Sequence, residues 1–217
     1  MVLLVLGWSS GAVAASYLRL DGVVVDPILT TGGTVHSYMG PNLAPGVVLR
    51  DVDLSSADLS FANLTHTNIW ACCGDGYQPD LSGANFRNSD FSYSFGKGGL
   101  YLAGGADFTN AKIMNADIGA GTGSNFTNVD FTGSEMSGDF TNAIFVAADL
   151  SGTWDLEYGV FTGATYSGGS LSNRTLFPTG FDPIAAGMVL VPEPSTAILV
   201  TLGLIGISLR RKATKTS

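Results

Sequence analysis

The sequence predicts an all-β solenoid body with a targeting segment at each end of the chain. Large apolar residues recur at a fixed spacing of five residues through most of the chain. The 29 glycines and the small charged fraction of 13% indicate an unusual backbone geometry instead of helical bundles, because Gly is costly inside regular elements. Short apolar runs lie near both ends, beside patterns typical of export and sorting signals.

The period of five extends from residue 47 to residue 171. It matches neither the period of about 3.6 that an amphipathic helix requires nor the period of about 2 of a half-buried strand. A fixed short period indicates a solenoid, in which each repeat packs only on its neighbours. The apolar residues at the centre of each repeat, called repeat centres below, are Leu49, Leu54, Leu59, Leu64, Ile69, Leu81, Phe86, Phe91, Phe108, Ile113, Ile118, Phe126, Phe131, Met136, Phe140, Phe145, Leu150, Phe161, Tyr166 and Leu171.

Small residues and Asp or Asn precede the repeat centres in a constant order. Ala57 and Ala84 lie two residues before a centre, and Asp58 and Asn85 lie one residue before it. Ser or Thr often follows the centre, and the whole rhythm resembles the pentapeptide-repeat family. The resemblance implies a right-handed, quadrilateral β-helix, and the number of centres gives about five coils at four centres per coil.

Elementary packing explains why such a rhythm suits a square coil. If each side takes five residues, one large apolar side chain from each side can point to the axis, and a small one can fill the space at the same level. The Asp, Asn, Ser and Thr between them face water and can bond to nearby backbone groups at the corners. The repeat centres are therefore predicted to form the core.

Four segments interrupt the period. Residues 71–80, 92–105 and 119–123 are Gly-rich and are expected to loop out from the coil, whereas residues 153–158 keep neither the small nor the apolar position.

The rest of the chain divides around the solenoid at residues 47–171. Residues 15–46 contain strand-like runs bounded by turn signals and are predicted to form an N-terminal cap. Residues 172–190 are predicted to form a C-terminal cap or linker, because an open solenoid exposes unpaired edges.

Residues 1–14 are predicted to be a signal peptide. Met1 to Leu6 is apolar, and Ala12-Val13-Ala14 gives the small-residue pattern that a signal peptidase cleaves, here after Ala14. No basic residue precedes Arg19, which favours a start codon further upstream and leaves a buried N-terminal strand as the alternative.

The end of the chain carries a proline-containing motif, an uncharged run and a basic cluster. In order, these comprise Val191, Pro192, Glu193, Pro194 and Ser195; then residues 196–209; then Arg210, Arg211 and Lys212. Their order and position resemble the PEP-CTERM sorting signal of bacteria that carry an exosortase. The resemblance implies that residues 191–217 are processed by an exosortase-type enzyme, and that the protein is retained at, or released from, the cell surface.

The uncharged run is predicted to be a short transmembrane helix that makes the membrane a partner of the chain. Its length of about 21 Å falls short of a hydrocarbon core of about 30 Å, which suits a transient anchor. The basic cluster should stay in the cytoplasm by the positive-inside tendency, so that everything before Pro192 lies outside.

The negative charge of the chain between its two ends argues against nucleic acid as a partner. Residues 15–195 hold 18 acidic and 6 basic residues and thus a net charge of −12. Such a surface repels phosphate backbones, so no nucleic-acid partner is expected.

The sequence offers no catalytic, cofactor-binding or metal-binding residues, and the protein is predicted not to be an enzyme. His36 and His66 are the only histidines, and neither lies in a motif. The acidic residues follow from the repeat, so a solvated acidic face is favoured over calcium binding.

One insertion is a candidate contact loop for glycan or protein, because it contains Trp70, Cys72, Cys73 and Tyr77. Packing of this loop against the coil edge is the alternative. The adjacent cysteines are interpreted as two thiols, with a vicinal or intermolecular disulfide as the alternative.

Three hypotheses for function follow. The favoured one is an exported structural or interaction protein of a bacterial exopolysaccharide or biofilm context, whose further partners could be extracellular polysaccharide or surface proteins. The second is an acidic DNA mimic that binds a topoisomerase, which the electrostatics would suit but the signals at both ends oppose. The third is a surface enzyme or lectin that acts through the aromatic insertions. We keep it in the form of a surface glycan-binding protein.

Overall fold

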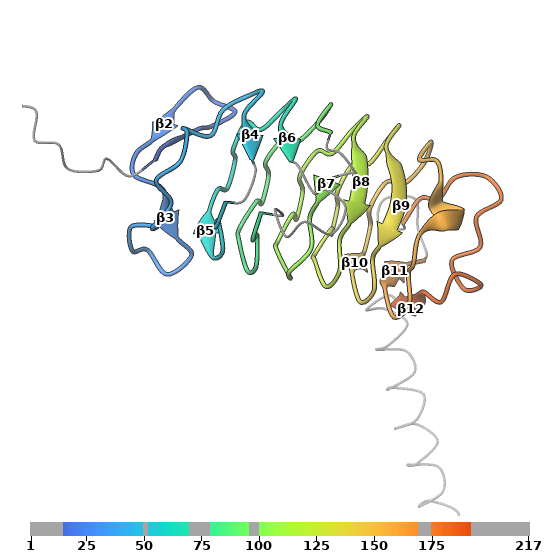
Figure 1. The fold of residues 1–217 in the computed structure, drawn as a ribbon. Helices are drawn as coiled ribbons and strands as arrows, with labels where there is room; N and C mark the ends of the chain where they lie inside the picture. The colour runs from blue at the N-terminus through green and yellow to red at the C-terminus, as the bar shows by residue number, and fades with distance from the viewer. Residues whose placement is uncertain (1–14, 50–51, 70–78, 96–99, 169–174, 192–217) are drawn as a thin grey trace, which may run out of the picture.

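The computed structural model describes residues 15–49, 52–69, 79–95, 100–168 and 175–191, which form an elongated stack of coils (Figure 1). The coils follow one another from the N-terminal end to the C-terminal end. The regular elements within the described residues are short: β1 (Tyr17–Leu18), β2 (Val24–Val25), β3 (Leu29–Thr30), β4 (Val48–Leu49), β5 (Ala57–Asp58), β6 (Asn68–Ile69), β7 (Leu100–Tyr101), β8 (Asp117–Ala120), β9 (Glu135–Asp139), β10 (Ile144–Phe145), the 3₁₀ helix η1 (Leu156–Tyr158), β11 (Thr165–Ser167) and β12 (Val189–Val191).

Four ladders of parallel pairing connect the successive coils and give the body four sides. The first runs through Asp58, Asn85, Asp107, Asn125, Ile144, Thr165 and Val189. The second runs through Asn63, Asp90, Lys112, Asp130, Asp149 and Leu176. The third joins Asp53 to Asp80, and further along it Tyr101 pairs with Ala120, Ala120 with Asp139, and Asp139 with Val160. The fourth joins Val48, Asn68 and Phe95, and continues through Asp117, Glu135 and Trp154.

The repeat centres form one continuous core along the axis. The centres buried in the structure are Leu49, Leu54, Leu59, Leu64, Leu81, Phe86, Phe91, Phe108, Ile113, Ile118, Phe126, Phe131, Met136, Phe140, Phe145, Leu150, Phe161 and Tyr166. The side chain of Ile69 and the whole of Leu171 lie outside the described residues. One row of phenylalanines stacks from coil to coil, with ring centroids 5.0 Å apart for Phe86 and Phe108, 5.3 Å for Phe108 and Phe126, and 5.3 Å for Phe126 and Phe145.

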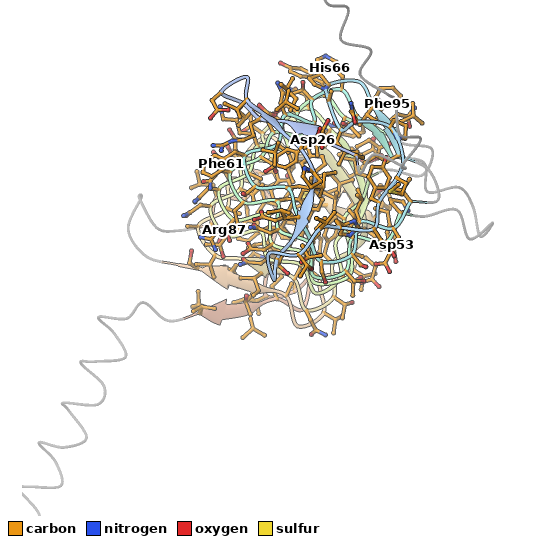
Figure 2. All side chains as sticks on the ribbon, turned by 90° about the vertical axis from the view of Figure 1, so that its left-hand side faces the viewer. Asp26, Asp53, Phe61, His66, Arg87 and Phe95 are labelled. Carbon is orange, nitrogen blue, oxygen red and sulfur yellow. The ribbon has the colours of Figure 1, made fainter. Side chains whose placement is uncertain are left out.

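The polar positions of the repeat bond locally to the backbone at the corners. The Asp107 carboxylate accepts the Thr109 backbone N–H at 2.9 Å, and the Asp130 carboxylate accepts that of Thr132 at 2.9 Å. These Asx turns explain why Asp or Asn directly precedes many of the centres. Figure 2 shows Asp53, Phe61 and Arg87 at the periphery of the coil, where such corner and side residues meet solvent.

At one corner, asparagine side chains form hydrogen bonds from one coil to the next. Asn88, Asn110 and Asn128 adopt positive φ angles of 58°, 61° and 57°. The Asn110 amide donates to Asn88 Oδ1 at 3.2 Å, and the Asn128 amide donates to Asn110 Oδ1 at 3.1 Å. Asn tolerates this left-handed backbone better than most residues and also ties neighbouring coils together.

Residues at the N-terminal end cover the first coil. Strand β1 pairs antiparallel with β2, and β3 pairs antiparallel with β5. The buried His36 ring joins this region to the solenoid, because its Nδ1 accepts the Tyr38 backbone N–H at 3.0 Å and its Nε2 lies 2.9 Å from the Ser55 carbonyl oxygen. His36 is thus a structural residue of the cap, and His66 is exposed on the coil surface.

The structure corrects two expectations about the Gly-rich segments. Residues 119–123 do not loop out, since β8 pairs with β7 and β9 and Gly121 is buried against the rings of Phe126 and Phe140. In the segment 92–105, Leu100 and Leu102 are buried within a coil. Strand β8 shifts its register against both β7 and β9 between Ile118 and Ala120, so that Gly119 is taken up inside the ladder.

The segment 153–158 also keeps both inward positions, contrary to the sequence-based expectation. Thr153 is buried at the small position and donates its hydroxyl to the Leu150 carbonyl at 2.7 Å, while Leu156 is buried in the core. Asp155 has a φ of 62°, which turns the chain so that η1 can deliver Leu156 inward.

The C-terminal part extends the ladders beyond the last predicted centre. Leu176 pairs with Asp149, and β12 pairs in parallel with β11, so that the coil pattern continues to Val191. In the part of the chain that the structure describes, no helix has the length and apolar character to span a membrane. The predicted transmembrane segment 196–209 lies outside that part.

Candidate functional site

The sorting residues predicted from the sequence adjoin the end of the solenoid. Val191 is the last residue of β12 and is exposed. The other members of the motif and the basic cluster, namely Pro192, Glu193, Pro194, Ser195, Arg210, Arg211 and Lys212, lie outside the described residues.

The predicted contact loop also falls outside the described residues, since these exclude Trp70, Cys72, Cys73 and Tyr77. Nearby, the His66 and Tyr93 rings stack with centroids 5.3 Å apart, and Tyr93 is 53% exposed. Figure 2 shows His66 and Phe95 on the same side of the coil, at the surface.

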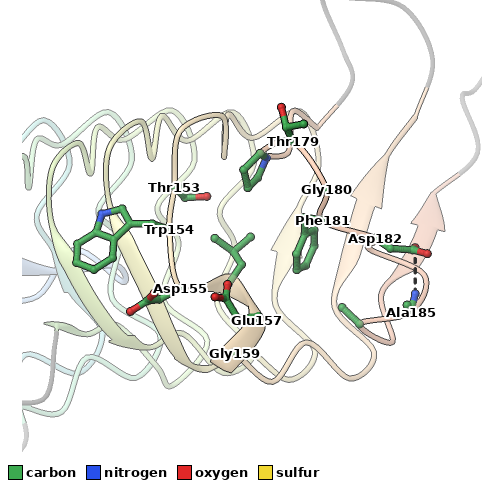
Figure 3. A pocket seen from close by; sticks show the side chains of 13 residues that line it. Thr153, Trp154, Asp155, Glu157, Gly159, Thr179, Gly180, Phe181, Asp182 and Ala185 are labelled. Carbon is green, nitrogen blue, oxygen red and sulfur yellow. Dashed lines mark hydrogen bonds between the residues drawn. The ribbon is translucent and has the colours of Figure 1, made fainter.

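A pocket of about 670 Å³ lies at the C-terminal end of the solenoid (Figure 3). One part of its wall comes from η1 and the residues before it, and the other from the segment that precedes β12. In the view of Figure 3, Trp154 lies on one side, Phe181 and Asp182 lie on the other, and Asp155 and Glu157 lie between them.

The core holds both walls of this pocket in place. Leu156 is buried, so the residues on either side of it are fixed at the surface. The Phe181 ring packs edge-on against Phe161 with centroids 5.7 Å apart and stacks on Phe177 at 5.3 Å. The Asp182 carboxylate accepts backbone N–H groups of Ile184 and Ala185 at 2.9 and 3.1 Å, which closes the following turn.

The pocket has a strongly negative lining. Among the described residues that line it are Asp155, Glu157 and Asp182, and none of these lining residues is Lys, Arg or His. Within the described chain, the Asp155 and Glu157 side chains form no hydrogen bond and no ion pair.

The Glu135 carboxyl lies on the strand that pairs with Trp154 and is affected by the charge of Asp155. Desolvation by burial, and then the charges of Asp117 and Asp155, raise the pKa of the Glu135 carboxyl. Desolvation by burial also raises the pKa of Asp117. Elsewhere the Asx turns act in the opposite direction, since hydrogen bonds from the Ser55 hydroxyl and backbone hold the pKa of Asp53 below its ordinary value.

No group of three or more His, Cys, Asp or Glu residues is arranged to hold a metal ion in the described part of the chain. The sequence-based reasoning missed the pocket as a whole. Two signals pointed towards it, namely the interrupted period at 153–158 and the aromatic residues Phe177 and Phe181 beyond the last repeat centre.

Comparison with known proteins agrees with the repeat body and the tail. A family model for pentapeptide repeats, with 8 copies, matches residues 44–70, and a model for the PEP-CTERM protein-sorting motif matches residues 190–212. No curated protein matches the chain.

The solved structures similar to this chain include pentapeptide-repeat proteins and a fluoroquinolone resistance protein. One from Nostoc Pcc 7120, alr5209, is 23% identical, with 69% of this chain and 79% of that chain covered and a TM-score of 0.25. One from the Arabidopsis thaliana thylakoid lumen is 21% identical, with coverages of 59% and 70% and a TM-score of 0.29. QnrB1, a plasmid-mediated fluoroquinolone resistance protein, is 17% identical, with coverages of 73% and 87% and a TM-score of 0.28.

These TM-scores are too low to support an argument about function. The chain contains pentapeptide repeats, matched over residues 44–70, and a C-terminal PEP-CTERM protein-sorting motif, matched over residues 190–212.

Proposed function

We propose that this protein is an exported, non-enzymatic structural or interaction protein of a bacterial exopolysaccharide or biofilm matrix. It is anchored at the surface by its tail and then retained there or released by processing. The PEP-CTERM motif implies export and processing by an exosortase-type enzyme. The matrix role, the membrane anchor at 196–209 and cleavage after Ala14 by signal peptidase are parts of the proposal.

The observation that carries the proposal is the position of the motif relative to the fold. Among the described residues the ladders reach Val191, and the matched sorting motif spans residues 190–212, so the motif overlaps the last described strand. Since contacts in a solenoid are made between neighbouring coils, removing residues after Val191 deletes no described ladder. Processing can thus change the location of the protein while the described body stays folded.

The charge and the local hydrogen bonds of the body's surface are compatible with export. Residues 15–195 have a net charge of −12, which keeps the protein soluble and away from anionic membrane faces. The Asx turns and asparagine ladder satisfy the polar groups of the corners without a ligand or partner.

Expression in an exosortase-bearing host tests the proposal. We would compare the full chain with a version lacking residues 192–217 and with Glu193→Ala, and follow mass, membrane fraction and medium. We expect a full-length membrane precursor that loses its tail in the parent, persistence of that precursor in Glu193→Ala, and prompt release of the truncated form.

The control for this experiment is Tyr93→Ala, which removes an exposed side chain of the described body that does not line the pocket and should leave processing unchanged. Accumulation of all versions in the cytoplasm with residues 1–14 intact would refute the proposal. In that case, binding to a topoisomerase would be the next function to test.

A further inference from the structure

The pocket at the C-terminal end of the solenoid has the size and construction of a small-ligand site. Its volume of about 670 Å³ falls in the usual range of about 300 to 1,000 Å³ for such sites. Its walls rest on Leu156 and Phe161, which are both buried core residues. The pocket is therefore preformed, and binding would not require ordering of the chain.

An exposed aromatic surface is part of this pocket. Trp154 lines it and is 52% exposed, although its backbone is fixed in the ladder by pairing with Glu135. A rigidly held indole offers a broad apolar face at low entropic cost, and it attracts a cation more strongly than other aromatic rings do. The Phe181 ring adds an apolar surface on the opposite wall (Figure 3).

The charge of the pocket selects the ligand. Asp155 and Glu157 form no hydrogen bond or ion pair within the described chain, and no basic side chain is among the described residues that line the pocket. Anionic ligands such as phosphates or uronic acids would be repelled. A ligand that presents an ammonium group together with an apolar ring face would pair with the carboxylates and stack on Trp154.

We propose that this pocket binds an amino sugar, as part of a saccharide whose amino groups are not acetylated. The pyranose face would stack on Trp154, and the ammonium group would pair with Asp155 or Glu157. This inference rests on the proposed function, because an exported matrix protein meets polysaccharide, and it adds the class of ligand and the site.

Calorimetric titration of the full chain, purified in a mild detergent, tests the site with defined probes. These are a glucosamine tetramer, the corresponding N-acetylglucosamine tetramer, an uncharged glucose tetramer and trilysine. We expect the glucosamine tetramer to bind at least about tenfold more tightly than its acetylated form, since a charged hydrogen bond is worth about 1.5 to 3 kcal/mol.

Three variants remove the proposed contacts one at a time. Trp154→Ala, Asp155→Asn and Glu157→Gln should weaken binding, with Trp154→Ala and at least one of the neutralised carboxylates each costing about tenfold. Asn suits the left-handed backbone at residue 155, so Asp155→Asn changes the charge without a backbone penalty. Tyr93→Ala is the matched control, since Tyr93 is 53% exposed, is aromatic and does not line the pocket.

The outcomes separate specific binding from attraction to an acidic surface. Equal binding of the acetylated tetramer would overturn the role of the ammonium group, and equal binding by all variants would overturn the site. Trilysine binding that depends on Trp154 and Glu157 as strongly as sugar binding does would assign the pocket to cationic peptides instead. Because the titration does not depend on export, its failure is distinguishable from a failure of the proposed function.

Discussion

Phe126→Ala is the substitution that most directly probes the stacked core. Phe126 is fully buried and its ring is stacked between Phe108 and Phe145, with centroids 5.3 Å from each. Truncating a buried Phe to Ala costs about 3 to 5 kcal/mol, depending on how far the site can collapse. We expect a loss in the upper half of this range. The reason is that backbone hydrogen bonds fix the spacing between neighbouring coils, so the coils cannot collapse into the cavity. One of these bonds runs from the Phe126 N–H to the Ile144 carbonyl at 2.7 Å.

Phe61→Ala is the matched control because it removes the same ring from the surface. Phe61 is 41% exposed, and its ring carries the Arg19 guanidinium at 4.9 Å. This loss should be about 1 kcal/mol or less. The free energy of unfolding would be measured by urea titration of the parent, both alanine variants and Phe126→Leu. The Leu variant should recover most of the loss because the buried Leu59 fills the equivalent position in the same row. Equal losses for Phe126→Ala and Phe61→Ala would refute the assignment of inward and outward positions.

Three further substitutions or truncations test the coil, its charges and its end. Gly138→Ala should lower the melting temperature strongly, because the added Cβ would overlap the Gly119 carbonyl in the neighbouring coil. Glu135→Gln should raise stability near neutral pH, since burial raises the pKa of Glu135 in the folded state and parent stability then falls as pH rises through that raised pKa. Its advantage should vanish on acidification in melts between about pH 4 and 8. Deleting residues 189–217 should lower the melting temperature more than deleting residues 192–217, because only the first removes β12 from its pairing with β11.

Most of the core follows from the sequence because the repeat imposes one local rule at every side of the coil. The Asx turns at Asp107 and Asp130 involve residues only two positions apart, and the following Phe must then point inward. A rule of this kind is visible without knowledge of distant contacts. The pentapeptide repeats and the sorting motif that the sequence predicts are confirmed, whereas the C-terminal transmembrane helix stays a prediction.

The interruptions could not be predicted in the same way because their structures depend on neighbouring coils. Whether Gly121 loops out or stays in the coil is decided by space between the rings of Phe126 and Phe140, which lie further along the chain. Leu156 reaches the core only because Asp155 adopts a left-handed backbone, a conformation that its sequence position does not reveal. The pocket combines these effects, since it requires Trp154 and Phe181 to come together across the last coils.

The two ends of the solenoid solve the problem of an unpaired strand edge by different means. At the N-terminal end, β3 pairs antiparallel with β5 and so covers the ladder that begins at Asp58. At the other end of the same ladder lies β12, whose three residues are all exposed. Proline cannot donate a ladder hydrogen bond, so the sequence predicts that full ladder pairing does not continue through Pro192 and Pro194, the residues at which processing is proposed.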